Sequence, residues 1–459
     1  MKRKQSALFN PQSHPLPQDK ISRISVSPEI LWEIPMHRIL AAVSLFAVAA
    51  CGLNGTDRYK DDEETAQATP VTNDVGYATY GEDNLADTMA SNDNASMGTD
   101  GTAGDTNIPD PEDRPIMQAQ VVLDRQGFGP GVIDGKMGMS TENALQGFQE
   151  ANDLDVTGEL DEATKAKLAQ WDTIPATRVV TIPAEWGRAQ YHEIPDDTAE
   201  KAKMKRLGYS SLDERLAERF HTTVAVLKTL NPGGMPAGME NAPAANGRTP
   251  ATASASPASA PTPTSSASDG GSSMKAGAQS FFSAGRQIRV PNIGGDRIAP
   301  GSVKDGDWQR TLASLGVGSE QPKVAKIVVS KSEDTLKAFD QSGKLVAEFT
   351  VSSGSSHDPL PIGNWEVTGV GHNPTFSFDP DLMWDVPDSE AKQQLPPGPN
   401  GPVGVVWIDL SKEHYGIHGT PEPETIGRAQ SHGCVRLTNW DAARLAQMVS
   451  TSTKVVFEK

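Results

Sequence analysis

Two long polar stretches decide how the rest of this chain can fold. Residues 52–114 are rich in Asp, Glu, Asn, Thr, Gly and Ala, and residues 233–284 are rich in Pro, Ala, Ser, Thr and Gly. Segments with so few large apolar side chains cannot recover the conformational entropy that ordering costs. We therefore predict a disordered acidic tether at 51–115 and a low-complexity insertion at 233–284, which divide the 459 residues into several small domains.

A short apolar run marks the N-terminal region. Residues 39–50 form a run of twelve residues, too few to span a bilayer but typical of the core of a signal peptide. Met36-His37-Arg38 would make a compact start for it, whereas residues 1–35 are polar and proline-rich. We expect residues 1–50 to comprise an upstream stretch that is not translated and a signal peptide that begins at Met36. The alternative is a short buried helix at 39–50.

Cys51 follows this run directly, after Val48-Ala49-Ala50. The arrangement resembles the lipobox of bacterial lipoproteins, which implies cleavage before Cys51 and lipid attachment to it. Gly52 is not the aspartate associated with inner-membrane retention. The resemblance therefore implies an exported protein with a lipid anchor, on the periplasmic face of the outer membrane if the cell is Gram-negative.

The chain is acidic, with a formal net charge of −18, and residues 1–50 carry six Lys/Arg against three Asp/Glu. Removal of that segment would take the net charge to −21. This sign argues against a nucleic-acid partner and against electrostatic adhesion to anionic lipid. Cys51 and Cys434 are the only cysteines, and their contexts differ so much that we expect no disulfide between them.

Cys434 is the centre of the densest group of reactive residues. It ends the segment Ser431-His432-Gly433-Cys434, and His418-Gly419 precedes that segment by a short loop. A thiol attacks only as the thiolate, so it needs a base or cation nearby, and both histidines are candidates. An isolated cysteine is more often a buried small hydrophobe or half of an intermolecular disulfide. This grouping instead favours a cysteine acyl-transfer site in which the sulfur is held ionised.

His418-Gly419, Ser431 to Cys434 and the downstream Asn439 together resemble the signature of the L,D-transpeptidase catalytic domain, over residues 322–459. The resemblance implies that Cys434 attacks an amide carbonyl of a cell-wall stem peptide, beside the L-centre of its third residue. It expels the terminal D-alanine and forms a thioester, which an amine of a second stem peptide resolves to a 3→3 crosslink. Water in that position would make an L,D-carboxypeptidase, and a protein amine would attach protein to peptidoglycan. A domain without activity would leave a peptidoglycan-binding lipoprotein.

The same resemblance assigns His418 as the general base, a task suited to a neutral imidazole. His432 is either a second base or a structural histidine. Ser431 and the backbone amides of Gly433 and Cys434 are expected to fix the turn and to supply oxyanion donors, since glycine lets the backbone approach the substrate closely.

Arg436 lies two residues past the nucleophile, and in an extended segment it points to the same face as Cys434. A guanidinium there can hold a carboxylate of the wall peptide through two hydrogen bonds, or steady the loop. We place Arg436, Gly419, Tyr415 and Asn439 in the substrate-binding set. Two tryptophans, Trp384 and Trp407, either line the groove or pack in the core.

A second resemblance covers residues 116–172. Helices are predicted from 116 to 123, 141 to 151 and 161 to 171, separated by glycine-rich turns. The pattern resembles the three-helix peptidoglycan-binding domain, which implies cell-wall glycan or stem peptide as the partner. The matching residues include Gly127-Phe128, Pro130-Gly131, Ile133-Asp134-Gly135, Phe148-Gln149 and Thr157-Gly158.

Residues 206–295 carry a weaker resemblance to a LysM module, a small glycan-binding α+β fold. It rests on Leu216 to Phe220, Leu227 to Pro232 and Gly285 to Pro291, with the insertion 233–284 between them. A module that only packs, without binding glycan, is the alternative.

The last third of the chain predicts a β-rich domain. Strands are predicted at 326–330, 335–340, 344–351, 365–370, 403–409 and 454–458, and a helix at 441–450. No Cys/His spacing resembles a zinc site and no glycine-rich loop leads into Lys-Ser/Thr, so we expect no metal and no cofactor. The expected fold class is thus multi-domain: a three-helix peptidoglycan-binding domain, a LysM-like α+β segment and a C-terminal β-rich L,D-transpeptidase domain.

Overall fold

The computed structural model describes residues 108–459, except 240–276, 295–296, 384–385 and 388. The chain divides into two units, 1–75 and 76–459, and the described residues all belong to the second. The predicted start at Met36, the lipobox at Cys51, most of the tether and insertion, and Trp384 lie outside the described residues. Within the described residues, no helix combines the length and apolar character needed to cross a membrane.

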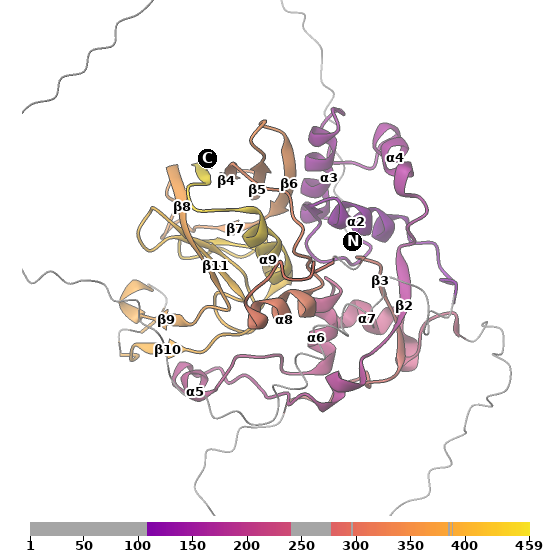
Figure 1. Cartoon of the computed structure of the whole chain (residues 1–459), viewed down its shortest axis with the longest axis horizontal. Coiled ribbons are helices and arrows are strands. Elements are labelled where there is room, and N and C mark those ends of the chain that lie inside the picture. Colours follow the sequence, from indigo (N-terminus) through magenta and orange to yellow (C-terminus); the bar gives the residue numbers. More distant parts are fainter. Residues whose placement is uncertain (1–107, 240–276, 295–296, 384–385, 388) are drawn as a thin grey trace, which may run out of the picture. The chain divides into compact units, whose positions relative to one another are not determined.

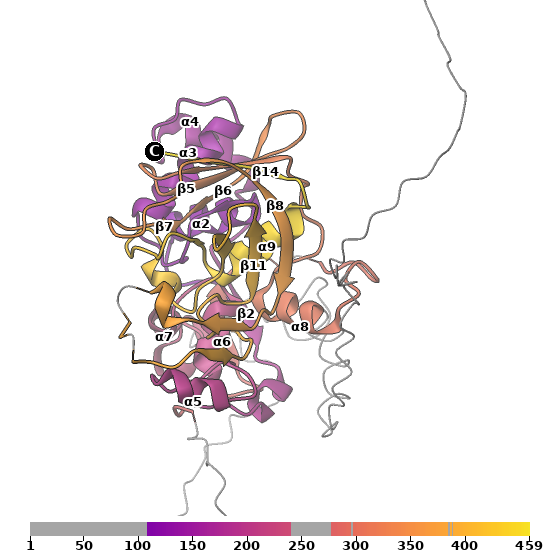
Figure 2. The ribbon, with the colours of Figure 1, turned by 90° about the vertical axis from the view of Figure 1, so that its left-hand side faces the viewer.

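A ten-stranded mixed sheet forms the C-terminal domain, in the order β1-β6-β5-β4-β14-β8-β11-β12-β13-β7. In Figure 2, β8 runs alongside β14 and β11, and it pairs antiparallel with both. The bounds are β1 Phe128–Gly129, β4 Lys326–Ser330, β5 Thr335–Phe339, β6 Leu345–Thr350, β7 Ser352–Ser353, β8 Gly363–His372, β11 Val406–Leu410, β12 Gly416–His418, β13 Val435–Arg436 and β14 Lys454–Glu458. The six predicted strands are all present, within three residues at either end.

Helix α9, Asn439–Met448, packs against β11 and β12. It begins where Thr438 caps the backbone N–H of Asp441. Trp440 and Leu445 are fully buried and share one hydrophobic core with Ile417 and Val435 of the sheet. Packing of this helix therefore fixes the positions of β12 and β13.

Three N-terminal helices form the second predicted domain: α2 Pro115–Arg125, α3 Met139–Ala151 and α4 Glu162–Leu168. Its core contains Phe128, Leu145 and Phe148. The two-residue strand β1 of this domain pairs in parallel with β6, and α3 packs on the same strand (Figure 1). The helical domain thus extends the edge of the catalytic sheet.

A third module has the order strand, helix, helix, strand. Strands β2 Thr177–Thr181 and β3 Gln287–Pro291 pair antiparallel, and helices α6 Leu212–Arg219 and α7 Val224–Leu230 lie between them in sequence. The predicted bounds of this module, 206–295, leave out β2. The remaining elements are α5 Thr198–Lys203, α8 Gly306–Leu315 and the antiparallel pair β9 Phe376–Phe378 and β10 Gln393–Leu395 beside α5.

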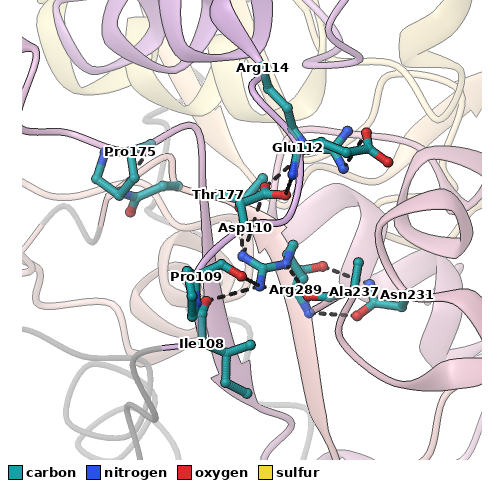
Figure 3. A network of polar contacts seen from close by, with 11 residues as sticks. Ile108, Pro109, Asp110, Glu112, Arg114, Pro175, Thr177, Asn231, Ala237 and Arg289 are labelled. Atoms are coloured by element: carbon teal, nitrogen blue, oxygen red, sulfur yellow. Dashed lines mark hydrogen bonds and ion pairs between the residues drawn. The ribbon is translucent and has the colours of Figure 1, made fainter. Parts of the chain in front are cut away.

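Arg289 of β3 ties this module to the segment that leads into α2 (Figure 3). Its guanidinium is 1% exposed and donates to the carbonyl oxygens of Ile108, Pro109 and Ala237 and to the Thr177 hydroxyl, at 2.8–3.1 Å. These five hydrogen bonds use all three nitrogens of the buried guanidinium, as a buried charge requires. The arginine therefore joins three separate segments through one side chain.

All three modules meet at a buried polar junction, which we define as Asp124, His221, Asp441 and Arg444. Arg444 of α9 lies 3.4 Å from Asp124 of α2, and Nδ1 of His221, which follows α6, lies 3.1 Å from the same carboxylate. Nε2 of His221 lies 2.9 Å from the Leu315 carbonyl oxygen. These charges hold the pKa of Asp124 well below its usual range although burial alone would raise it.

Candidate active site

The reactive residues lie on neighbouring strands at one end of the sheet. In the parallel pair β12 and β13, Ile417 lies opposite Val435 and His418 lies opposite Arg436. Ile417 and Val435 are fully buried in the core. Side chains alternate along a strand, so His418 and Arg436 face the other side, and Cys434 joins them beside Gly416. The structure therefore brings thiol, imidazole and guanidinium to one face.

Cys434 is half-buried and is the free cysteine of the described part of the chain. Its Sγ lies 3.8 Å from the His414 carbonyl oxygen. Burial raises the pKa of the thiol, and the smaller opposing effects of the Gly416 backbone and the Arg436 charge do not offset it. The expectation of a resting thiolate is therefore wrong for this structure, because desolvation outweighs the nearby positive charge.

His418 is 6% exposed, and its Nδ1 lies 2.7 Å from the carbonyl oxygen of Gly419. A carbonyl only accepts, so Nδ1 donates and Nε2 carries the lone pair of the neutral ring. Burial lowers the pKa of His418 to about 4, against the effect of the Gly419 hydrogen bond and with a further decrease from Arg436. The imidazole is therefore neutral at physiological pH, as a general base requires.

Trp407 of β11 lies against both His418 and Gly416. Its ring stacks on His418 with centroids 5.5 Å apart and planes 19° apart. A Cβ at Gly416 would lie 2.5 Å from the same ring. Gly416 is thus required for the indole to reach its position, a pairing that the sequence alone did not reveal.

The turn before the nucleophile is held by Ser431. Its hydroxyl donates to the Cys434 carbonyl at 2.5 Å and accepts from the Gly354 amide at 2.8 Å. Gly433 has a φ of 97°, and a Cβ there would lie 2.5 Å from the Tyr415 ring. Only glycine satisfies both conditions without strain. Tyr415 therefore supports the turn directly, beside whatever contact it makes with substrate.

Arg436 is half-buried, and its guanidinium donates to the Gln430 carbonyl, with the Glu422 carboxylate close enough to interact. Its Nε is buried and has no hydrogen-bond partner among the described residues. A buried donor of this kind is unfavourable unless a further acceptor arrives. The arrangement leaves the guanidinium able to donate a hydrogen bond to a carboxylate.

Two further predicted site residues, His432 and Asn439, differ in their exposure. His432 is exposed on the turn. Asn439 is fully buried, and its side chain contacts Glu218, the Pro399 carbonyl and the Val405 amide. Asn439 is therefore out of reach of a substrate in this structure, and its amide organises the backbone around Gly419 instead. No cluster of three or more His, Cys, Asp or Glu suited to a metal ion occurs in the described part.

Comparisons with known proteins match both ends of the described chain. A family model described as "L,D-transpeptidase catalytic domain" matches residues 325–457, and one described as "Putative peptidoglycan binding domain" matches residues 112–168.

Among curated proteins, "Putative L,D-transpeptidase YkuD" of Bacillus licheniformis is 52% identical over 165 residues, which cover 36% of this chain and 79% of that protein. "Probable L,D-transpeptidase YbiS" of Escherichia coli K12 is 31% identical over 135 residues, 28% of this chain and 44% of that protein. A solved structure, "L,D-transpeptidase from Mycobacterium smegmatis", is 20% identical with a TM-score of 0.25, and the match covers 29% of this chain and 58% of that one.

The chain belongs to the L,D-transpeptidase family of the YkuD type, whose members are acyltransferases, and it carries a peptidoglycan-binding domain on its N-terminal side.

Proposed function

We propose that this protein forms 3→3 crosslinks in peptidoglycan through a thioester on Cys434. The observation that carries the proposal is the placement of Cys434 and His418 on one face of adjacent strands, with Nδ1 of the imidazole committed to the Gly419 carbonyl. That bond leaves Nε2 as the proton acceptor for the thiol.

The reaction divides into two acyl transfers. In the first, the Cys434 sulfur forms a bond to the stem-peptide carbonyl carbon while His418 Nε2 takes the thiol proton. Collapse of the tetrahedral intermediate breaks the amide bond, and His418 returns the proton to the departing D-alanine amine. In the second, an acceptor amine attacks the thioester, His418 removes its proton, and the sulfur leaves as a thiolate that regains that proton.

A neutral thiol and a neutral imidazole suit this order of proton transfers. Burial disfavours the charged forms of both groups, so the thiolate is formed together with its attack instead of standing ready. We assign Arg436 to the substrate carboxylate because its Nε is buried without a partner. The amides of Gly433 and Cys434 are the oxyanion donors of the proposal.

The N-terminal modules hold the wall near this site. A cavity of about 690 Å³ in the three-helix domain is lined by Glu142, Gln146, Thr157 and Lys165 among others. Polar side chains of both charges suit a stem peptide or glycan. The three-helix domain contributes β1 to the catalytic sheet and Asp124 to the buried junction. Peptidoglycan bound to this domain is therefore held at a fixed distance from Cys434. We assign the β2-α6-α7-β3 module the same kind of partner, as a LysM-like fold.

We further propose export and a lipid anchor at Cys51, on the periplasmic face of the outer membrane in a Gram-negative cell. The support is the lipobox-like sequence Val48 to Cys51 after a twelve-residue apolar run. Either Cys51→Ser or globomycin treatment is expected to shift the protein from the membrane to the soluble fraction. Retention at the membrane in both cases would contradict the anchor.

Mass spectrometry of digested cell wall tests the crosslinking proposal. Expression of the full chain in a host without L,D-transpeptidases is expected to produce 3→3 dimers, and Cys434→Ser to produce none. Tripeptides without new dimers would point to an L,D-carboxypeptidase, and stem peptides joined to protein would point to protein attachment. An unchanged wall would contradict activity of either kind.

A further inference from the structure

A glutamate outside the catalytic domain bonds a side chain that lies against the active-site backbone. Glu218 of α6 is 9% exposed, and its Oε1 accepts a hydrogen bond of 2.7 Å from Nδ2 of Asn439, which lies 221 residues further along the chain. Its Oε2 is buried and has no hydrogen-bond partner among the described residues, and burial raises the pKa of Glu218 to about 7. In either protonation state an oxygen of this side chain can accept from Asn439.

The Asn439 amide is held in one orientation. Nδ2 also donates to the Pro399 carbonyl at 3.1 Å, while Oδ1 accepts from the Val405 amide at 3.2 Å. A flipped amide would face two acceptors with its oxygen and one donor with its nitrogen, so the network selects the observed orientation.

The oxygen of this amide lies against the backbone that carries the base. A Cβ at Gly404 or Gly419 would lie 1.9 or 2.3 Å from Oδ1, so neither position tolerates a larger residue. The Gly419 carbonyl is the group that accepts from Nδ1 of His418 at 2.7 Å. A continuous chain of contacts therefore leads from Glu218 through Asn439 and Gly419 to His418.

The module that carries Glu218 is fixed to the catalytic helix at a second point. The imidazole of His221 stacks on Trp440, which follows Asn439, with centroids 4.9 Å apart and planes 7° apart. Both ring nitrogens of His221 face acceptors, on Asp124 and Leu315. The position of α6 relative to α9 is therefore held by this stacking contact as well as by the Glu218 hydrogen bond.

We propose that Glu218 is a positioning residue for catalysis: it orients Asn439, which holds the Gly419 carbonyl where it fixes the Nδ1–H tautomer of His418. The inference rests on the proposed function, in which Nε2 of His418 takes the thiol proton. It follows that the β2-α6-α7-β3 module completes the active site in addition to any contact with the wall, and that residues 322–459 alone lack one of its parts.

Three variants of the full chain test this. Glu218→Leu removes the acceptor with little change in volume. Glu218→Gln keeps an acceptor oxygen and is the rescue variant. Glu214→Leu is the matched control, because Glu214 lies on the same helix and bonds Ser210 and Asn400 but not Asn439.

Two measurements separate positioning from general stabilisation. The ¹⁵N NMR shifts of the His418 ring, assigned by their loss in His418→Gln, report which nitrogen carries the proton. The acylation rate of Cys434 by a carbapenem, followed by intact mass on protein shown to be folded, reports the catalytic consequence. A purely structural role would change the melting temperature of Glu218→Leu but neither of these readouts.

We expect one Nδ1–H tautomer in the unsubstituted protein, Glu218→Gln and Glu214→Leu, and mixed tautomers in Glu218→Leu. The acylation rate of Glu218→Leu should fall by between about tenfold and a hundredfold, the usual effect of a misplaced catalytic group, while the other two variants stay within about twofold. An unchanged tautomer in folded Glu218→Leu, or equal loss in Glu214→Leu, would overturn the proposal. Failure of the unsubstituted protein to acylate would instead contradict the proposed function itself.

Discussion

The structure predicts how the reactivity of Cys434 depends on pH, because burial disfavours the charged forms of both Cys434 and His418. A thiolate and imidazolium pair would need a proton to move from Cys434 to His418 in the resting enzyme. The decrease of the His418 pKa from 6.5 to about 4 adds about 3 kcal/mol to that transfer. The raised pKa of the thiol adds to the same penalty. The neutral pair should therefore dominate at neutral pH.

Alkylation by iodoacetamide between pH 4 and 10 measures this directly, because the reagent is uncharged and reacts with the thiolate. The rate should rise once, with a midpoint above that of an ordinary thiol, and with no plateau below neutral pH. His418→Gln should leave the profile nearly unchanged at low pH, since the imidazole holds no proton from the thiol there. A low-pH plateau that disappears in His418→Gln would refute the argument and show a resting ion pair.

Three other predictions concern the surrounding charges. Arg444→Met should lower the unfolding free energy by about 3–5 kcal/mol in denaturant titration, because it leaves Asp124 buried with less compensation, and the double variant Asp124→Asn/Arg444→Met should recover part of that loss. Burial raises the pKa of Glu348 to about 8, so the folded state keeps a proton that the unfolded state releases above the usual carboxyl pKa. The contribution of this group to the unfolding free energy is therefore fully present at acidic pH and is lost as pH rises towards 8. Glu348→Gln should raise the melting temperature at pH 8 but not at pH 4. Arg436→Lys should raise KM for a tetrapeptide donor by about tenfold with a smaller effect on kcat, since an ammonium cannot replace a bidentate guanidinium. A tenfold decrease in kcat with KM unchanged would contradict the carboxylate role.

Much of the catalytic sheet was accessible from sequence because its strands are short segments rich in β-branched and aromatic residues. Residues 326–330 and 454–458 were predicted with the bounds that the structure shows. The reactive cluster was accessible for a different reason, since Cys434, His418 and Arg436 all lie within 19 residues of each other on segments that pair directly. Both the strands and the reactive residues can therefore be identified from local sequence.

Long-range packing was not accessible in the same way. Strand β2 pairs with β3 across more than a hundred residues, and no local pattern in Thr177–Thr181 points to that partner. The buried role of Asn439 depends on Glu218, 221 residues away, so a motif position that suggests substrate contact proved to be internal. The protonation of Cys434 depends on desolvation by the folded chain, which composition cannot report.

Isolation of the acyl-enzyme is the most direct test of the central claim that Cys434 carries the covalent intermediate. Purified protein, mixed with a tetrapeptide donor and quenched in acid, should gain the mass of the donor less that of the released D-alanine. Trypsin should place that mass on the peptide 429–436, which contains Cys434, and Cys434→Ser should show no adduct. Turnover of the donor by Cys434→Ser, or a stable adduct on any other residue, would contradict the account.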